Sequence, residues 1–173
     1  IVRGDWSSDV CSSDLAIIYD SFDVYSSGIH DKFIAEAANQ GFEVVADEAF
    51  TADNNTNFSV QIQKAQDASA ELVFLPIYYQ QASLILVQAK QMGYEPDFFG
   101  CDGLDGLLTV ENFDTSLAEG IMLLTPFAAD AQDDFTKNFV ATYKEKYGDI
   151  PNQFAADAYD AVYAIKEIGR AHV

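Results

Sequence analysis

The sequence predicts an α/β protein with a doubly wound parallel sheet flanked by helices. Short apolar segments alternate with segments whose apolar residues recur at helical spacing, and one short segment is apolar at almost every position. This alternation is typical of parallel strands that are joined by right-handed helical crossovers. Of the 173 residues, 49% are hydrophobic and 21% are charged, so the chain can bury one sizeable core.

The first part of the chain contains two strand–helix units. We expect strands at residues 16–20 and 42–50, and helices at residues 28–40 and 58–68. Gly41 follows the first helix and supplies its C-terminal stop signal. Thr56 or Asn57 is the expected N-cap of the second helix, because short polar side chains accept hydrogen bonds from the first free amides.

Residues 72–77 (LVFLPI) form the segment that is apolar at almost every position. A parallel strand that is buried on both faces has this composition, so we expect the segment in the middle of the sheet. A helix at residues 80–92, a strand at 97–101 and a further strand at 121–125 complete the unit. In such a sheet, ligands bind beyond the carboxyl ends of the strands.

Two amphipathic helices are expected at residues 134–147 and 153–167, with no strand between them. Such an ending would leave their apolar stripes uncovered. We therefore expect these helices to belong to a different sheet and the chain to hold a truncated lobe.

Both ends of the chain have an unusual composition. Residues 5–15 (DWSSDVCSSDL) match the translation of a common short-read sequencing adapter, and residues 168–173 match that of its reverse complement. We therefore expect residues 1–15 and 168–173 to be adapter-derived and residues 16–167 to be native. The native segment then contains one cysteine, Cys101, and one histidine, His30.

Charge and motifs exclude several classes of function. The net charge of −19, from 28 acidic and 9 basic residues, would repel nucleic acids and anionic bilayers. No segment approaches the roughly 20 apolar residues that span a membrane, and we expect any export signal to lie upstream. Glycine-rich nucleotide loops, nucleophile elbows and metal-ligand motifs are missing from the sequence, which disfavours an enzyme and predicts no cofactor and no metal.

We expect the single cysteine and the single histidine of the native segment to have structural roles and not to act in catalysis or metal binding. We expect Cys101 to be a packed small hydrophobic residue at a strand end. His30 is interpreted as a solvated helix residue.

Polar and aromatic residues gather where three predicted strands end. Tyr25 follows the first strand, Tyr78 and Tyr79 follow residues 72–77, and Asp102 follows the strand at 97–101. A carboxylate flanked by aromatic rings suits an ammonium group, which it binds by charge pairing while ring faces add cation–π attraction. The sequence therefore predicts a small amine as the ligand. The alternative is that the tyrosines only pack and the aspartate only forms a turn.

Six segments carry a resemblance to a known family. They are IIYDSFDVYSSG, NFSVQIQKAQ, AELVFLPIYYQQASLILVQAKQMG, FFGCDGLDG, EGIMLLT and FVATYKEKYGDIPNQFAADAYDAV. Together and in this order, they resemble the substrate-binding proteins of branched-chain amino-acid ABC transporters, which have the type I periplasmic-binding fold. The resemblance covers nearly all of residues 16–167.

The resemblance implies two lobes joined by a three-stranded hinge, with an amino acid trapped between them. Residues 16–125 would form most of the second lobe, and residues 126–167 would hold the crossover and helices of the first lobe. Asp102 would accept the ligand ammonium, while Tyr25 and one of Tyr78 and Tyr79, with preference for Tyr79, would line the cleft. The ligand carboxylate would be held by groups of the missing lobe.

The resemblance also implies partners and location. The amino acid would be delivered to the permease of an ABC transporter, by a periplasmic or extracellular lipoprotein whose lipid anchor lies outside this segment. No enzymatic step is implied. Two departures leave the ligand side chain open: Ser26 follows Tyr25 where the family usually has glycine, and Asp102 stands where some members carry glutamate.

Two other functions remain open from the sequence. The same fold could serve as the ligand-sensing domain of a receptor or regulator. A flavodoxin-like or Rossmann-like enzyme is the second alternative, although the glycine loop that would bind a phosphate is missing after residues 16–20.

Overall fold

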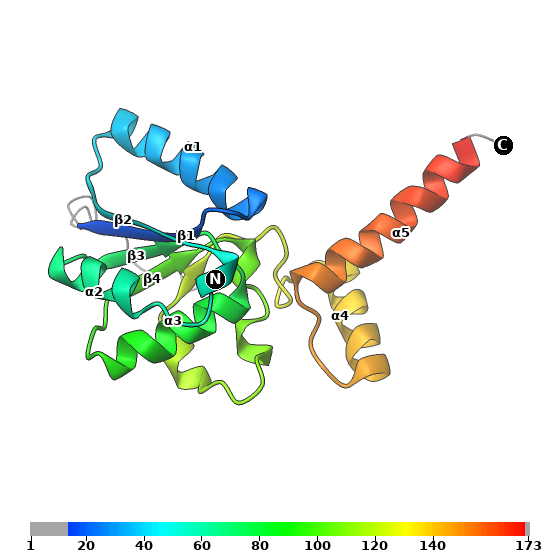
Figure 1. The fold of residues 1–173 in the computed structure, drawn as a ribbon. Helices are drawn as coiled ribbons and strands as arrows, with labels where there is room; N and C mark the ends of the chain where they lie inside the picture. The colour runs from blue at the N-terminus through cyan, green and yellow to red at the C-terminus, as the bar shows by residue number, and fades with distance from the viewer. Residues whose placement is uncertain (1–13, 172–173) are drawn as a thin grey trace. The chain divides into compact units, whose positions relative to one another are not determined.

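The computed structural model describes residues 14–171, and a parallel sheet forms the core of residues 15–123 (Figure 1). Its strands are β1 (Leu15–Asp20), β2 (Val44–Phe50), β3 (Leu72–Leu75), β4 (Asp97–Gly100) and β5 (Met122–Leu123). All four strand pairs are parallel, and the order across the sheet is β2-β1-β3-β4-β5. This topology confirms the predicted doubly wound α/β class.

Helices cover both faces of the sheet. The α-helices of the described residues are α1 (Val24–Gln40), α2 (Ser59–Asp67), α3 (Tyr79–Gln91), α4 (Asp134–Tyr147) and α5 (Gln153–Ala171). Helix α1 lies on one face, and α2 and α3 lie on the other (Figure 1). Three short 3-10 helices follow β4, at Asp102–Leu104, Leu107–Thr109 and Thr115–Ala118.

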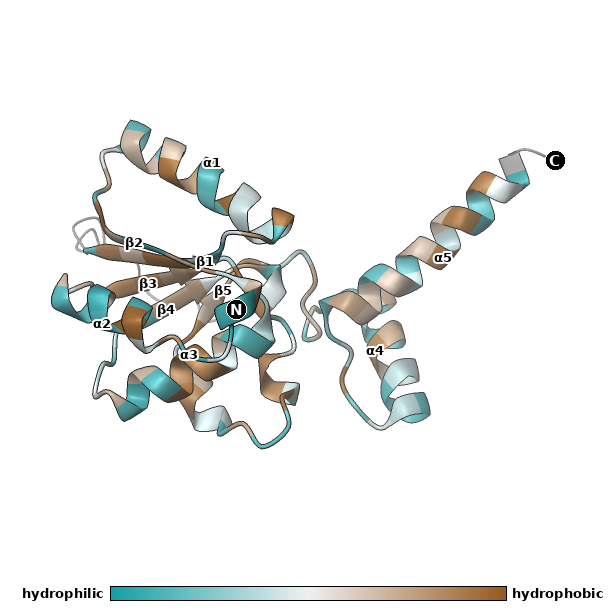
Figure 2. Cartoon of the chain, in the orientation of Figure 1, coloured by the Kyte–Doolittle hydropathy of each residue, from teal (hydrophilic) through white to brown (hydrophobic). Residues whose placement is uncertain are grey.

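Strand β3 is the middle strand, as its uniformly apolar composition predicts. Val73, Phe74 and Leu75 are all buried. Figure 2 shows β3 and β4 largely in the brown of apolar residues, whereas α1 and α2 mix teal with brown turns. On the α2 and α3 side, Phe58 is fully buried and meets Phe50 edge-on, with ring centroids 4.9 Å apart.

The starts of two helices differ from the sequence-based expectation. Helix α1 begins at Val24, before residue 28, because the Asp23 carboxylate caps it by accepting a 2.9 Å hydrogen bond from the Ser26 amide. Phe58 occupies the N-cap position of α2, one residue after the predicted Asn57, but the Asn57 Oδ1 atom still accepts a 3.0 Å hydrogen bond from the Ser59 amide at the start of the helix. The Phe58 ring at this position is fully buried.

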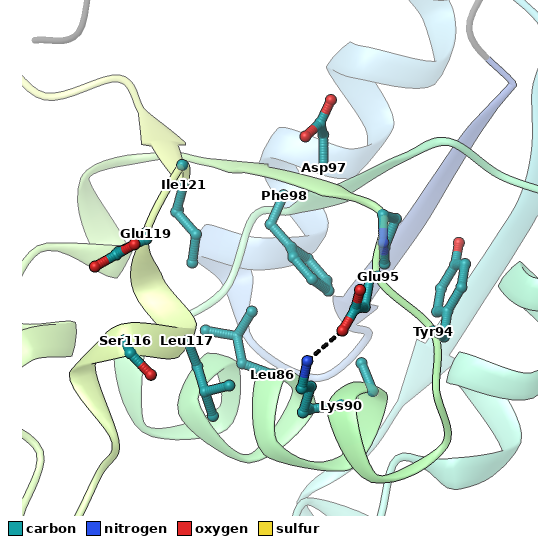
Figure 3. Close-up of a pocket in the computed structure, with 13 residues that line it drawn as sticks. Leu86, Lys90, Tyr94, Glu95, Asp97, Phe98, Ser116, Leu117, Glu119 and Ile121 are labelled. Atoms are coloured by element: carbon teal, nitrogen blue, oxygen red, sulfur yellow. Dashed lines mark hydrogen bonds and ion pairs between the residues drawn. The ribbon is translucent and has the colours of Figure 1, made fainter.

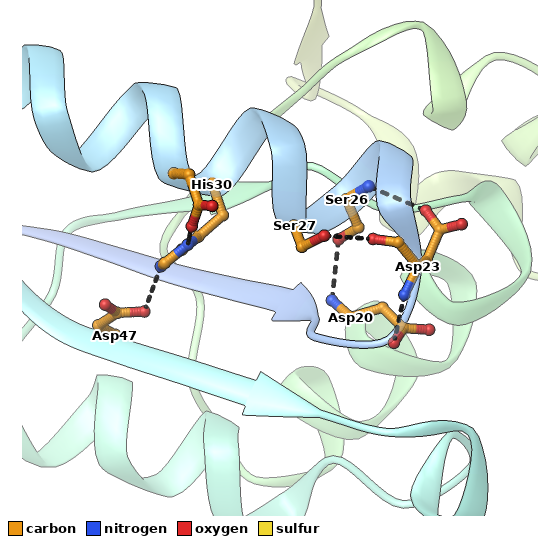
Figure 4. A network of polar contacts seen from close by, with 7 residues as sticks. Asp20, Asp23, Ser26, Ser27, His30 and Asp47 are labelled. Carbon is orange, nitrogen blue, oxygen red and sulfur yellow. Dashed lines mark hydrogen bonds and ion pairs between the residues drawn. The ribbon is translucent and has the colours of Figure 1, made fainter.

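The interpretation of His30 as a solvated residue is also wrong. His30 is only 9% exposed, and its ring stacks on Tyr19 with centroids 3.7 Å apart. Its Nε2 lies 2.9 Å from Asp47 on β2, and its Nδ1 lies 3.1 Å from Asp31 (Figure 4). Helix α1 therefore packs on the sheet through polar as well as apolar side chains.

The chain divides after Leu124 into two compact units. The first contains the sheet with α1, α2 and α3, and the second contains α4 and α5. In the second unit, α4 contains no buried residue, and Val162 and Ile165 of α5 are mostly exposed.

No helix within residues 14–171 is both long and apolar enough to cross a membrane. The residues that the sequence assigns to adapter translation lie largely outside the described part, at 1–13 and 172–173. Of the remainder, Leu15 belongs to β1, and residues 168–171 continue helix α5. Their origin stays a prediction.

Candidate functional site

The strand order brings three of the predicted site residues to one edge of the sheet. β1, β3 and β4 are consecutive neighbours, and their carboxyl ends lie side by side because the strands are parallel. Tyr25 lies in the first turn of α1, just beyond β1, and Tyr78 is the N-cap of α3, just beyond β3. Asp102 opens the 3-10 helix that follows β4.

Tyr25 and Asp102 are in direct contact although 77 positions separate them in the sequence. The Tyr25 hydroxyl donates a 2.9 Å hydrogen bond to Oδ1 of Asp102. The backbone amide of Gly103 donates a 2.9 Å hydrogen bond to the same hydroxyl oxygen. Since the amide can only donate, the hydroxyl proton is directed to the carboxylate.

Gly103 is a site residue that the sequence reasoning did not single out. A Cβ atom at this position would lie 2.6 Å from the carbonyl oxygen of Ile77 and 2.8 Å from the Tyr25 hydroxyl. The loop after β4 can therefore approach β3 and Tyr25 only with glycine here. The signal in the sequence was a glycine directly after an acid at a strand end.

The two adjacent tyrosines after β3 have different surroundings. The Tyr78 ring stacks on the Tyr25 ring, with centroids 5.0 Å apart and an angle of 24° between the planes. Tyr78 is also 37% exposed. Tyr79 is partly buried and packs against the hydrophobic core. Tyr78 thus joins Tyr25 in the cluster, whereas the sequence reasoning preferred Tyr79.

Negative charge dominates the electrostatics of this edge. Burial raises the pKa of the Tyr25 hydroxyl far above its ordinary value, the hydrogen bond from Gly103 opposes the rise, and the bond to Asp102 adds to it. Burial also raises the pKa of Tyr78, with further contributions from the charges of Asp23 and Asp102. No ion pair within residues 14–171 includes Asp102. The half-buried carboxylate is therefore suited to a cation supplied by a ligand.

The loop that leads into α1 is fixed by local hydrogen bonds (Figure 4). The Asp20 carboxylate accepts from the Phe22 amide at 2.9 Å, and the Asp20 amide donates to the Ser26 hydroxyl at 2.8 Å. The Ser27 hydroxyl donates to the Asp23 carbonyl at 2.7 Å. These contacts hold the first turn of α1, and Tyr25 with it, in place.

A hollow of about 220 Å³ lies at the end of β4 opposite to Asp102. In Figure 3, Leu86, Phe98 and Leu117 point into it, and Lys90 and Glu95 form an ion pair at its rim. It contains none of the predicted site residues. Within the described residues, no group of three or more His, Cys, Asp or Glu side chains could hold a metal ion.

The periplasmic binding protein family matches residues 4–171, which is almost the whole chain. The chain belongs to the periplasmic binding protein family. One curated relative is the leucine-, isoleucine-, valine-, threonine- and alanine-binding protein of Pseudomonas aeruginosa. Its sequence is 28% identical to this one, over 87% of this chain and 39% of its own length. The leucine-specific-binding protein of Salmonella typhimurium is 27% identical, over 87% of this chain and 40% of its own length.

Solved structures of the family agree with this fold. A leucine binding protein from Thermotoga maritima matches with a TM-score of 0.77 and 26% identity, covering 95% of this chain and 47% of that one. A second match is a branched-chain amino acid transporter substrate binding protein from Streptococcus pneumoniae, solved with isoleucine. Its TM-score is 0.69 and its sequence identity 27%, and the match covers 87% of this chain and 42% of that one. This periplasmic binding protein chain thus spans less than half the length of these relatives.

Proposed function

We propose that the chain forms part of an extracytoplasmic solute-binding protein that captures an amino acid between two lobes for import by an ABC transporter. The observation that carries the proposal is the Asp102 carboxylate, which the Tyr25 hydroxyl holds at the carboxyl edge of the sheet. Its Oδ2 accepts no hydrogen bond from the described residues. It is therefore the acceptor that we assign to the ligand ammonium.

The ligand class follows from the site together with the relatives. An α-ammonium group needs an anionic partner, and aromatic rings beside that partner add attraction for the cation. The names of several relatives specify leucine, isoleucine or valine. We infer an aliphatic amino acid, with Asp102 on its ammonium group and with Tyr25, Tyr78 and Tyr79 lining the cleft.

Residues 16–125 form most of one lobe in this proposal, and residues 126–167 contribute helices to the other. The exposed apolar side chains of α5, such as Val162 and Ile165, support a sheet from the other lobe as their partner. Closure of the two lobes on the amino acid would make both sets of contacts together, so the ligand shifts the population toward the closed form. Binding and delivery require no bond chemistry, and we assign the chain no enzymatic activity.

The remaining partners belong to the complete protein. We infer that the permease of an ABC transporter receives the amino acid, and that the protein is a periplasmic or extracellular lipoprotein anchored outside this segment. We infer that the protein does not bind nucleic acid or the surface of an anionic membrane. Its net charge of −19 supports this inference, because nucleic acids and anionic lipids are also negatively charged.

The test is a change at Asp102 in the complete binding protein. Asp102→Ala should weaken the binding of L-leucine by about 2 kcal/mol or more, because the ligand ammonium loses its charged partner. Isothermal titration calorimetry measures the effect. Asp97→Ala is the matched control, since it removes an equal charge from the exposed opposite end of β4 and should leave affinity unchanged. Equal affinities of wild type and Asp102→Ala would refute the assignment.

A further inference from the structure

Tyr25 bonds to the loop after β4 at two points that are adjacent in the chain. Its hydroxyl accepts from the Gly103 amide and donates to the Asp102 carboxylate, and both distances are 2.9 Å. The oxygen therefore ties the side chain of Asp102 to the backbone of the next residue. Because Oδ1 of Asp102 is held by this hydrogen bond, the direction of its other carboxylate oxygen, Oδ2, is also fixed.

The ring of Tyr25 has a different environment from its hydroxyl. One ring face is stacked on Tyr78 at a centroid distance of 5.0 Å. Tyr78 forms the outer member of the pair and is 37% exposed. Of these two rings, Tyr78 is the more exposed and therefore has the larger surface to offer a cation.

We propose that Tyr25 is a positioning residue that acts through its hydroxyl on Asp102, while Tyr78 supplies the ring face that contacts the ligand ammonium. This inference rests on the proposed function, and it assigns separate roles to two tyrosines that the sequence treats alike. Gly103 completes the arrangement, because a side chain there would enter the space of the Tyr25 hydroxyl.

Paired substitutions separate hydroxyl from ring at each position. Tyr25→Phe keeps the ring and removes the hydroxyl, whereas Tyr25→Leu removes both. We expect Tyr25→Phe to weaken L-leucine binding to the complete protein about tenfold, the size typical of a lost hydrogen bond to a charged group. For Tyr78 the pattern should be reversed: Tyr78→Leu should weaken binding more than Tyr78→Phe does, because only the leucine variant removes the aromatic ring.

A second readout distinguishes positioning of the carboxylate from a general structural role. The analogue 4-methylpentanoate is leucine without its ammonium group. In Tyr25→Phe, the preference for L-leucine over 4-methylpentanoate should fall, because only the ammonium contact is damaged. A partly unfolded variant would lose both ligands equally and keep the ratio. In an Asp102→Asn background, Tyr25→Phe should cause little additional loss, since the two residues act as a unit.

Different binding results would overturn the proposed function and this inference. If Asp102→Asn binds L-leucine like wild type, or if wild type does not bind it, the proposed function fails and this inference fails with it. If Asp102→Asn is weakened but Tyr25→Phe binds normally while Tyr25→Leu does not, Tyr25 acts through its ring and only the inference is overturned. An unchanged ligand preference in Tyr25→Phe overturns it too.

Discussion

Close packing around Gly103 decides how the candidate site is assembled. Its missing side chain lets the loop after β4 approach the Ile77 carbonyl and the Tyr25 hydroxyl. The amide of Gly103 then satisfies the hydroxyl oxygen, so the phenol proton is left for Asp102. One glycine thus connects the loops that follow three strands.

Gly103→Ala should lower the free energy of unfolding by about 1–3 kcal/mol, because the new Cβ overlaps backbone as well as a side chain. Gly28→Ala is the matched control. Gly28 lies within α1, and a Cβ atom added there would have no neighbouring atom within 4 Å, so alanine should stabilise the helix by about 0.5–1 kcal/mol. Urea unfolding followed by circular dichroism measures both changes, and equal effects of the two variants would contradict this packing.

The thiol beside the site should react slowly at neutral pH. Burial raises the pKa of Cys101 from 9.0 to about 11, and the Asp102 charge adds to the rise. Because the thiolate is the nucleophile, alkylation by iodoacetamide should be slow near neutral pH and accelerate as the pH approaches 11. Peptide mapping by mass spectrometry separates Cys101 from Cys11. The chain unfolded in guanidinium is the control, and equal folded and unfolded rates would contradict the burial.

The sequence predicted which residue types gather at the site but not their individual contacts. Strand ends are visible in the apolar pattern, so Tyr25, Asp102 and the tyrosine pair could be assigned to one edge of the sheet. Periodicity does not determine side-chain directions in a loop. The stacking of Tyr78 on Tyr25, in place of the preferred Tyr79, therefore became visible only in the structure.

At the scale of elements, the pattern of apolar residues predicted the five strands and five α-helices among the described residues. The bounds of α4 agree fully with the prediction, because Asp133 caps its first turn and Gly148 ends it with positive φ. The 3-10 helices between β4 and β5 were not predicted, since single turns have no period to detect. His30 was misjudged because its carboxylate partner Asp47 lies on another element.

Phe58 connects α2 to the core and gives a prediction at this scale. Its ring is 0% exposed, and its amide donates to the Gln88 side chain of α3 at 2.8 Å. Phe58→Ala should lower the free energy of unfolding by about 3–5 kcal/mol through the cavity that it creates. Phe22→Ala serves as the control, because that ring is 77% exposed and its removal should change stability little. Comparable losses in both variants would contradict the observed packing.

At the scale of the whole molecule, the strand order follows from pairings between distant segments. The sequence predicts that residues 72–77 lie in the middle of the sheet, because only a central strand is buried on both faces. It does not predict that β3 pairs with β1 on one side and β4 on the other, since nothing local encodes a pairing partner. This order creates the candidate site by making the ends of those strands neighbours.

The unit that ends at Leu124 should fold by itself. Its hydrophobic core extends from Ala16 to Leu107, with partly buried residues up to Leu123, so residues 14–124 contain the complete cluster. This fragment should show a single cooperative thermal transition by circular dichroism. Residues 125–171 are the comparison, and we expect no cooperative transition there because α4 contributes no buried residue. A fragment 14–124 without a sigmoidal transition would contradict a self-contained core.

A crystal structure of the complete binding protein with L-leucine tests the central claim most directly. The account predicts the leucine nitrogen within about 3.2 Å of the Asp102 carboxylate, at the distance of a charge-assisted hydrogen bond. The Tyr25 hydroxyl should remain on Oδ1, and the Tyr78 ring should lie beside the nitrogen. A leucine bound with its ammonium group away from Asp102 would contradict the account.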